Sequence, residues 1–452
     1  MKGQPRRRSN PARRLAFRVL RAVNGHGAYA NLELARELRE AKLDRRDAAF
    51  ATELVAGTCR LMGTYDRIIA AASGRAAGRF DDDVLDVLRL EAHQLLSMRV
   101  PAHAAVASSV DVAALEIGER VAGLVNAIGR KIAAHDLDGW LGVLAEGLDE
   151  RDALALRTHH PRWIVDALAD VLSSGELEAA LLADNVPPLT HLATRPGLGT
   201  RDELAGAGAE LARYSPYGAY TKGAPGDLAA VREGRAGVQD EGSQLVALAL
   251  ARVEVPDGPW LDVCAGPGGK AALLGGLAIE QGSFLLAGEA QPHRAELVAQ
   301  AVRGYTGPHR PVVVVADGTH APYRAGSYAR VLADVPCTGL GALRRRPEAR
   351  WRRVPGDLDA LVRLQKKLLR AALEATMPGG VVAYVTCSPH RAETVEVLES
   401  GDLPGFSVLR AADYLPEVPD TTRDDKYVQL WPHRHGTDAM FLALLRRDDF
   451  SV

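Results

Sequence analysis

From residue 237 to its end, the chain alternates short apolar runs with stretches long enough to form helices. This alternation is typical of a parallel sheet covered by helices, because a crossover must carry the chain back between parallel strands. We therefore expect residues 237–452 to form an α/β domain with a mostly parallel, doubly wound sheet. Ligands of such sheets bind beyond the carboxyl ends of the strands. The apolar runs lie at 260–263, 283–288, 312–316, 331–335 and 381–385, and 361–376 is one of the helix-length stretches.

Residues 10–145 follow a helical period, and no alternating strand pattern interrupts it. A new helix is expected to begin at Asp44, because an aspartate three residues ahead of another acid is typical of a helix start. These features predict a compact all-α bundle at the N-terminal end of the chain. The face of its first helix that we expect to be buried consists of Ala12, Leu15, Ala16, Val19 and Leu20.

The region 146–236 mixes short helical and extended pieces with Gly and Pro, and we expect a linker followed by a small α/β subdomain that binds RNA. Aromatic and basic side chains interleave there, and such a surface can stack bases and hold phosphates. A structural loop explains the same residues equally well, so no single residue is assigned a role. The interleaved residues are Arg213, Tyr214, Tyr217, Tyr220 and Lys222.

Basic residues are concentrated in two places, although the formal net charge of the chain is only −2. Residues 1–9 are expected to form a basic, flexible tail. The stretch 344–353 contains six arginines and one glutamate. Local basic patches of this kind indicate a polyanionic partner, although a solvated tail explains the first of them as well. The candidate RNA-binding residues are Arg344, Arg345, Arg346, Arg350 and Arg352.

Four cysteines in 452 residues do not form a disulfide framework, and their spacing fits no zinc pattern. No apolar run is long enough to span a membrane, and the first residues lack the apolar stretch of a secretion signal. We therefore expect a cytoplasmic protein, monomeric, with no metal and no membrane partner. Any functional cysteine would act as a free thiol.

The first predicted strand of the α/β domain leads into a glycine-rich loop, 261–270, with the sequence LDVCAGPGGK. Its glycines allow a sharp turn and a close approach to a ligand at the start of the next helix. The loop fits both NAD and S-adenosylmethionine, and it does not fit a nucleoside-triphosphate loop. Glu289 and Asp317 end the next two strands, where they suit a ribose diol and an adenine edge. Together these features predict an adenosine-binding site.

Two further strands end in cysteines, Cys337 in the sequence DVPCTG and Cys387 in the sequence YVTCSP. Because both strands are expected to be neighbours, both thiols should lie above the same cleft. Cys59 is expected to be a core residue, and Cys264 to line the cofactor loop. A thiol pair suits methylation at carbon 5 of a pyrimidine, because that carbon becomes nucleophilic only after a thiolate adds to C6. Asp334 is placed to neutralise charge at N3, and the C5 proton must then leave to a base.

The motifs CAGPGGK, DVPCTGLG, VTCS and HGTDAMFLALLRR resemble those of the RsmB/Sun (Fmu) family of bacterial ribosomal RNA cytosine-5 methyltransferases. The N-terminal bundle is similar to the NusB-like RNA-binding domain of that family. The resemblance implies a Rossmann-like class I methyltransferase domain, S-adenosylmethionine as cofactor and 16S rRNA as substrate. It also implies that Cys387 is the nucleophile and that Cys337 promotes release of the product. The positions expected at the cofactor and active site are Cys264, Ala265, Gly266, Pro267, Gly268, Gly269, Lys270, Glu289, Arg294, Asp317 and Asp334.

Two alternatives remain at this point. The same loop would serve a nicotinamide-dependent oxidoreductase, although hydride transfer has no need of two thiols. The chain could also be a non-catalytic RNA-binding factor in which only the helical domain acts. The presence of Lys270, Asp334, Cys337 and Cys387 together argues against that alternative.

Overall fold

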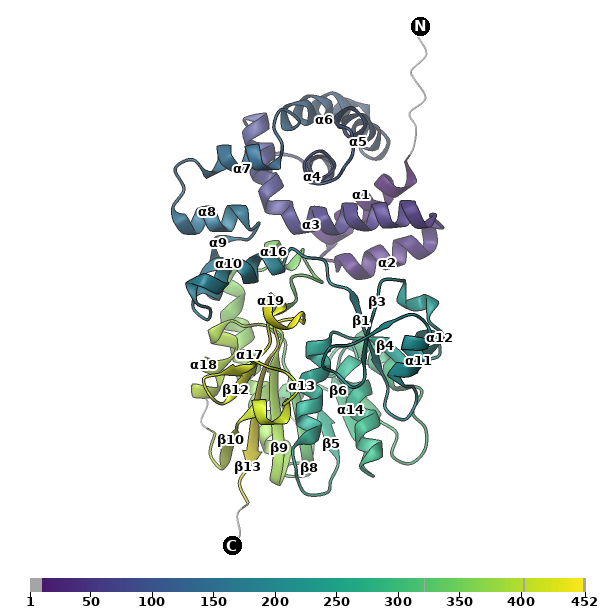
Figure 1. The fold of residues 1–452 in the computed structure, drawn as a ribbon, viewed down its shortest axis with the longest axis vertical. Coiled ribbons are helices and arrows are strands. Elements are labelled where there is room, and N and C mark those ends of the chain that lie inside the picture. The colour runs from purple at the N-terminus through teal and green to yellow at the C-terminus, as the bar shows by residue number, and fades with distance from the viewer. Residues whose placement is uncertain (1–9, 321, 401–402, 450–452) are drawn as a thin grey trace. The chain divides into compact units, whose positions relative to one another are not determined.

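The computed structural model describes residues 10–320, 322–400 and 403–449, and the predicted basic tail at 1–9 lies outside them. The chain divides into two compact units. The first, called the helical unit, comprises Met1–Asn185 and Leu343–Val354. The second, called the α/β unit, comprises Val186–Ala342 and Pro355–Val452. The chain therefore leaves the α/β unit once, contributes a short segment to the helical unit, and returns (Figure 1).

The helical unit confirms the predicted all-α bundle. Asn10 and Asp44 cap helices with their side chains, and Asp47 N donates to Asp44 Oδ1 at 2.8 Å. Helices α1, α4 and α6 pack on α3. The predicted apolar face of α1 is fully buried. The bundle helices are α1 (Pro11–His26), α2 (Ala30–Ala41), α3 (Arg45–Ser73), α4 (Asp82–Leu96), α5 (Ala102–Glu116), α6 (Glu119–Ile132) and α7 (Leu137–Ala145).

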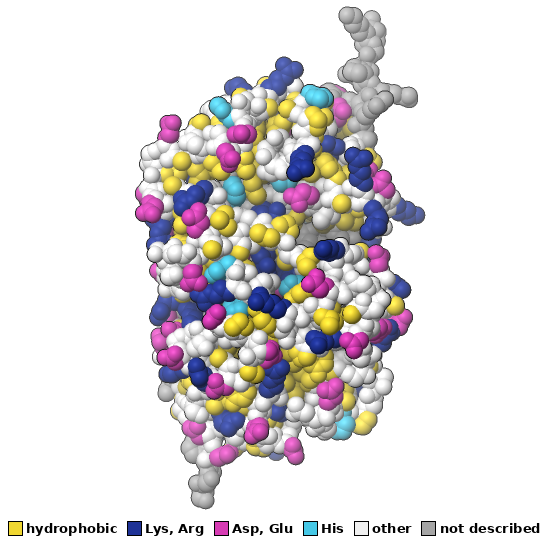
Figure 2. All heavy atoms as spheres, viewed as in Figure 1, with side chains coloured by type: hydrophobic (Ala, Val, Ile, Leu, Met, Phe, Trp, Pro, Cys, Tyr) yellow, Lys and Arg dark blue, Asp and Glu magenta, His cyan; other side chains and the backbone are white. Residues whose placement is uncertain are grey.

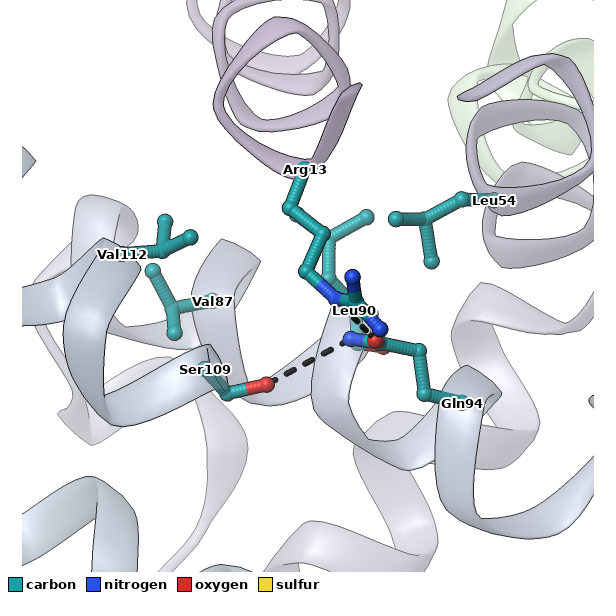
Figure 3. Close-up of a pocket in the computed structure, with 7 residues that line it drawn as sticks. All are labelled: Arg13, Leu54, Val87, Leu90, Gln94, Ser109 and Val112. Atoms are coloured by element: carbon teal, nitrogen blue, oxygen red, sulfur yellow. Dashed lines mark hydrogen bonds between the residues drawn. The ribbon is translucent and has the colours of Figure 1, made fainter. Parts of the chain in front are cut away.

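A polar group lies inside this bundle, around a cavity of about 10 Å³ between α1, α3, α4 and α5 (Figure 3). Arg13 Nε donates to Gln94 Oε1 at 2.6 Å, and Gln94 Nε2 donates to Ser109 Oγ at 3.4 Å. A cavity of this size has room for about one water molecule. The hydrogen-bonded side chains therefore contribute to packing, and the cavity is too small to bind a ligand.

The region 146–236 is divided at Asn185, whereas we expected one linker and subdomain. Its first part forms α8 (Glu150–Arg157), α9 (Arg162–Ala169) and α10 (Ser174–Ala183), which belong to the helical unit. These helices are only 8 to 10 residues long, so their sequence shows little periodicity. Their apolar side chains are nevertheless buried, and they include Leu154, Ile164, Val165, Leu168 and Leu181.

The second part of this region opens the α/β unit with a small antiparallel sheet of order β2-β3-β1-β4. Two short helices, α11 (Arg201–Gly206) and α12 (Ala229–Arg232), accompany it. Tyr220, one of the interleaved aromatic residues, pairs with His191 across the sheet, and its hydroxyl donates to Glu241. The strands are β1 (Thr190–Thr194), β2 (Glu210–Leu211), β3 (Gly218–Thr221) and β4 (Ala236–Val238).

The large sheet of the α/β unit has the order β11-β12-β13-β9-β8-β5-β6-β7, with β10 (Phe406–Leu409) paired to β13. The pairs among β5 to β9 are parallel, and β13 runs antiparallel to β9. The parallel strands are β5 (Trp260–Asp262), β6 (Leu285–Glu289), β7 (Val312–Val315), β8 (Tyr328–Asp334) and β9 (Thr376–Thr386). The remaining strands are β11 (Thr422–Arg423), β12 (Tyr427–Gln429) and β13 (Phe441–Arg447).

Both faces of this sheet are covered by helices, and each face has its own core. Alternate residues of β8 and β9 point to opposite faces, so Leu332 and Ala383 join one core while Val331 and Val382 join the other. This arrangement confirms the predicted mostly parallel, doubly wound, Rossmann-like sheet. The first core contains α13 (Glu241–Arg252), α14 (Gly269–Glu280) and α15 (Pro292–Val302), and the second contains α17 (Leu358–Ala375) and α18 (Val395–Glu399).

None of the helices in the described part of the chain is both long and apolar enough to cross a membrane.

Candidate active site

The glycine-rich loop connects β5 to α14 at the carboxyl edge of the large sheet. Gly268 caps α14 with a φ of 108°, a conformation that disfavours residues with a Cβ. A Cβ on Gly268 would also lie 2.9 Å from the backbone of Val298 in α15. A Cβ on Gly266 would lie 2.2 Å from Glu289 Oε2. Glycine at position 268 therefore lets the loop lie against α15, whereas at position 266 the neighbours are the ends of the Glu289 and Arg294 side chains.

Glu289, at the end of β6, is bound directly to this loop. Its Oε2 accepts from Gly266 N at 3.1 Å, and its Oε1 accepts from Gln291 N at 3.0 Å. Arg294 lies beside both partners, because its Nη2 donates to Gly266 O at 2.7 Å while its Nε is 3.6 Å from Glu289 Oε2. The carboxylate and the loop thus form one cradle. The structure brings together Gly266, Glu289 and Arg294, three of the residues expected at the cofactor site.

Asp317 follows β7 and is held by its own turn. Its Oδ1 accepts from the backbone N and the hydroxyl of Thr319, and its Oδ2 is 2.9 Å from His320 Nδ1. The hydrogen bonds from Thr319, followed by the contact with His320, lower the pKa of Asp317. The lowered pKa favours the ionised form of the Asp317 carboxylate. Asp317 is also exposed, just after β7.

A cluster of charges lies between β5 and β8. Lys270 Nζ donates to Asp334 Oδ2 at 2.8 Å, which places the lysine of the loop against the acid of the DVPC motif. Asp262, which we did not predict from the sequence, is buried at the end of β5, and its Oδ2 has no hydrogen-bond partner. Burial, followed by the charge of Asp334, raises the pKa of Asp262 to about 7.

The two thiols of the predicted pair are in contact. Cys337 follows β8 and Cys387 follows β9, and their Sγ atoms are 3.3 Å apart. The parallel register, which pairs Asp334 with Val385, brings the two loops side by side. The hydrogen bond with Cys387, followed by desolvation, raises the pKa of Cys337 well above its usual value. The other two cysteines lie elsewhere: Cys59 is buried in the bundle core and Cys264 lines the glycine-rich loop.

Gly341 fixes the loop after Cys337 to the loop after β9. Its backbone N donates to Cys387 O at 2.9 Å, and its O accepts from Ala439 N at 2.8 Å. A Cβ on Gly341 would lie 2.1 Å from Ala439 O, so a larger residue does not fit. The HGTDAM motif therefore contributes backbone, through Ala439, to the position of Cys387.

A buried polar network that the sequence did not predict lies behind the thiols. Glu393, in the short helix Arg391–Glu393, accepts from Thr338 N at 2.8 Å and from Gln365 Nε2 at 3.0 Å. Thr338 Oγ1 also lies 3.1 Å from Ser388 Oγ. The one signal in the sequence was Gln365, a polar residue on the apolar face of α17, where a helix buries side chains that need partners.

The structure does not bring the five candidate arginines together as one exposed surface. Their segment belongs to the helical unit, where α16 (Ala349–Arg352) packs on α3. Arg350 is fully buried and donates to His159 O and Asp184 O, so in this arrangement it cannot contact RNA. Arg344 is buried and Arg345 half-buried, whereas Arg346 and Arg352 are exposed.

The neighbouring Trp351 explains why this segment folds with the helical unit. Its ring lies over Gly63 of α3, where a Cβ would come within 2.1 Å of the ring. Its Nε1 donates to Cys59 O at 2.9 Å. Arg352 adds hydrogen bonds to Val23 O and Ala28 O. Two of the six arginines in the basic stretch, Arg350 and Arg352, thus anchor it by donating to backbone carbonyls.

Within the described residues, no three His, Cys, Asp or Glu side chains come together in a group that could hold a metal ion. On the face seen in Figure 2, Lys and Arg side chains are interspersed with Asp and Glu.

The chain is similar to known proteins along nearly its whole length. Residues 247–446 match the family model of 16S rRNA methyltransferase RsmB/F, and residues 10–134 match that of the NusB family. Rv1407 of Mycobacterium tuberculosis, which is named as a methyltransferase, is 51% identical over 99% of this chain and 98% of its own. Ribosomal RNA small subunit methyltransferase B of Pseudomonas putida is 31% identical over 86% of this chain and 88% of its own.

Solved structures show the same fold at lower identity. The crystal structure of PH0851 superposes with a TM-score of 0.81 at 20% identity, covering 98% of this chain and all of the other. NSun6 from Pyrococcus horikoshii, solved with SFG, superposes with a TM-score of 0.54 at 17% identity over 64% of this chain and 98% of the other.

Proposed function

The chain belongs to the RsmB/F family of S-adenosylmethionine-dependent rRNA methyltransferases, and we propose that it methylates carbon 5 of a cytosine in 16S rRNA. The observation that carries the choice of atom is the contact of two thiols, Cys337 and Cys387, at the carboxyl ends of adjacent parallel strands. Methylation of a ring nitrogen or a ribose hydroxyl needs no thiol, because those atoms are nucleophilic already. Carbon 5 needs covalent activation.

The residues of the cradle fit S-adenosylmethionine, which supplies a methyl group on a positively charged sulfur. Glu289 is held at the end of β6 with Arg294 beside it, where a carboxylate can bind a ribose diol. The glycines at 266, 268 and 269 carry no side chain at the start of α14, where the backbone N–H groups of the helix are available to a ligand. Asp317 remains exposed for the adenine edge. Cys264, Ala265 and Pro267 complete this loop.

The proposed reaction begins when the Cys387 thiolate adds to C6 of the cytosine and forms a C–S bond. Asp334, held by Lys270 at 2.8 Å, stabilises the ring at N3 as electrons move toward C5. Carbon 5 then takes up the methyl group. Loss of the C5 proton to a base pushes the electron pair back, breaks the C6–S bond and returns Cys387 as a thiolate. Cys337, in contact with Cys387, is the residue proposed to promote this release.

The two thiol roles are tested by alanine variants incubated with RNA and cofactor. Cys387→Ala should abolish methylation and give no covalent adduct, because nothing can add to C6. Cys337→Ala should accumulate a protein–RNA adduct, seen as a shifted band on a denaturing gel. The double variant is the matched control and should lose that band. An adduct with Cys387→Ala, but none with Cys337→Ala, would show that the two roles are reversed.

The substrate is tested by nucleoside mass spectrometry of 16S rRNA from cells that lack the protein. One 5-methylcytosine should disappear, and it should return with the unaltered chain but not with Cys387→Ala.

The cofactor is tested by calorimetry with S-adenosylhomocysteine and with NADH. Only S-adenosylhomocysteine should bind. Binding of NADH alone would favour the oxidoreductase alternative. The cytosine must be unstacked to reach the thiols, so we expect a loop or splayed nucleotide.

A further inference from the structure

Glu393 is a buried carboxylate that the reaction above does not use. It has no exposed surface, and the neighbouring Arg391 forms a salt bridge with Glu396. Three hydrogen-bond donors converge on it: Thr338 N, the Thr338 hydroxyl and Gln365 Nε2. All three are neutral, so the negative charge is shared with dipoles and is not cancelled by a cation. Leaving a charge buried in this way is costly, which calls for a role.

The hydrogen bonds of Glu393 hold the backbone on both sides of Cys337. Thr338 follows that cysteine, and Gln365 Nε2 also donates to Pro336 O at 2.9 Å, just before it. Thr338 in turn contacts Ser388, the residue after Cys387, through the two hydroxyl oxygens. The backbone O of Glu393 accepts from the Tyr384 hydroxyl at 2.9 Å, which ties the Glu393 backbone to β9. One buried group thus connects the loops of both thiols.

The two thiols have opposite charges around them. Lys270 lies on the Cys387 side: burial lowers its pKa, but Asp334 and then Cys387 raise it, and the net shift is upward. Glu393 lies on the Cys337 side and contributes to the raised pKa of Cys337, after Cys387 and desolvation. Tyr384 is a further titratable group that interacts with Cys337. When two thiols are in contact, ionisation of both is unfavourable because the two negative charges repel each other. The different charges near the two thiols therefore favour ionisation of one over the other.

We propose that Glu393 is a positioning residue that fixes the Cys337 loop and keeps Cys337 as a thiol, so that Cys387 is the one that ionises. The assignment rests on the proposed function, because only a reaction with one thiolate and one thiol needs such a bias. It explains how two cysteines at equivalent strand ends acquire different roles. A protonated Cys337 does not compete with Cys387 for C6.

The test measures how readily Cys337 ionises, in the full chain with Cys387→Ser so that a single thiol of the pair remains. Iodoacetamide labelling is followed against pH, and the Cys337 peptide is quantified by mass spectrometry. Glu393→Gln keeps the shape, because the amide oxygen can still accept from Thr338 N and Gln365 while the Thr338 hydroxyl turns. It should move the labelling midpoint of Cys337 to lower pH by about one unit. An unchanged midpoint would overturn the proposal.

Glu241→Gln is the matched control. Glu241 is also buried and accepts from Tyr214 N and Ser215 N, but it does not influence the pKa of Cys337. Its variant should leave the midpoint in place, and an equal shift in both variants would contradict a specific role for Glu393. Circular dichroism reports whether each variant is folded.

Thr338→Val provides a second test if Glu393→Gln does not fold. This variant leaves the carboxylate untouched but removes the hydroxyl that partly offsets its charge, so the Cys337 midpoint should rise by roughly half a unit. No rise would count against the proposal. Labelling needs neither RNA nor cofactor. If Cys337 labels as expected but the unaltered chain, with Cys387 in place, methylates no RNA, the proposed function is refuted while the effect of Glu393 on Cys337 stands.

Discussion

At the scale of single residues, Asp262 links the active site to the stability of the α/β unit. Its pKa is raised to about 7, whereas an aspartate in an unfolded chain titrates near about 3.9. The folded protein therefore binds this proton more tightly than the unfolded chain. As the pH rises from about 4 to about 7, the contribution of Asp262 to the free energy of unfolding falls, and above that range the penalty is complete.

Asp262→Asn should remove this penalty, because the amide carries no charge and its oxygen can still accept from Cys264 N. We expect the variant to be more stable than the unaltered chain at pH 8, by about 4 kcal/mol, and equally stable near pH 4. Urea unfolding at the two pH values measures the difference. A gain of equal size at both pH values would show that packing, and not ionisation, is responsible.

Site residues that directly follow a strand could be predicted from the sequence, whereas residues placed only by the tertiary fold could not. Cys337 and Cys387 follow apolar strands directly, so their position beyond the sheet edge could be predicted. Glu393 lies in a short helix of only three residues, which has no sequence pattern of its own, and only the folded chain brings it to Thr338. Asp262 ends its strand, as Glu289 does. Its burial could not be predicted, because it depends on neighbours far away in the sequence.

At the scale of elements, Gly341 tests how the two thiol loops are held together. Gly341→Ala would place a Cβ 2.1 Å from Ala439 O, and a backbone atom cannot turn aside as a side chain can. We expect a loss of about 1–3 kcal/mol in unfolding free energy. The hydrogen bond to Cys387 O should be lost as well, with slower adduct formation in single-turnover assays.

Gly206→Ala is the control for this prediction. Gly206 ends α11, and a Cβ there would meet nothing within 4 Å. Its replacement should leave stability unchanged or raise it, since alanine has the higher helix propensity. If both variants behaved alike, the close contact at Gly341 would not explain the loss.

Elements with a strong periodic pattern were predictable, and short elements were not. The five parallel strands lie within a few residues of the predicted apolar runs, and α17 lies close to the predicted helix at 361–376. Helices α8 to α10 are too short to show a period, so their membership of the helical unit could not be predicted. The order of the strands in the sheet depends on where each helical connection places the next strand, and the apolar pattern of the sequence does not show this.

At the scale of the whole molecule, the chain passes from the Cys337 loop straight into a segment of the helical unit, Leu343–Val354, before returning at Pro355. The charge pattern alone suggested a surface for RNA. The fold shows instead that one stretch contains two kinds of arginine, buried and exposed, which sequence cannot distinguish because both have the same side chain. Their effects on stability and on RNA binding should therefore separate.

Arg350 and Arg346 represent the two kinds. Arg350 spreads its guanidinium over His159 O, Asp184 O and Asn185 Oδ1 at 2.8 to 3.1 Å. A lysine cannot reach all three, so Arg350→Lys should lower the unfolding free energy of the helical unit by about 2 kcal/mol. Arg346 is exposed and lies over the Tyr29 ring. Arg346→Lys should change stability by less than about 0.5 kcal/mol.

RNA affinity measured against salt concentration should give the opposite ranking. Arg346→Ala should reduce the slope of log affinity against log salt by about 1, because one phosphate contact is lost. Arg350→Ala should leave the slope unchanged at a temperature where the variant is folded, because a buried guanidinium releases no counterion. A slope reduced by about 1 for Arg350→Ala, as for Arg346→Ala, would mean that the segment leaves the helical unit when RNA binds. The anchor formed by Trp351 over Gly63 would then have to open as well, and the fluorescence of Trp351 would report it.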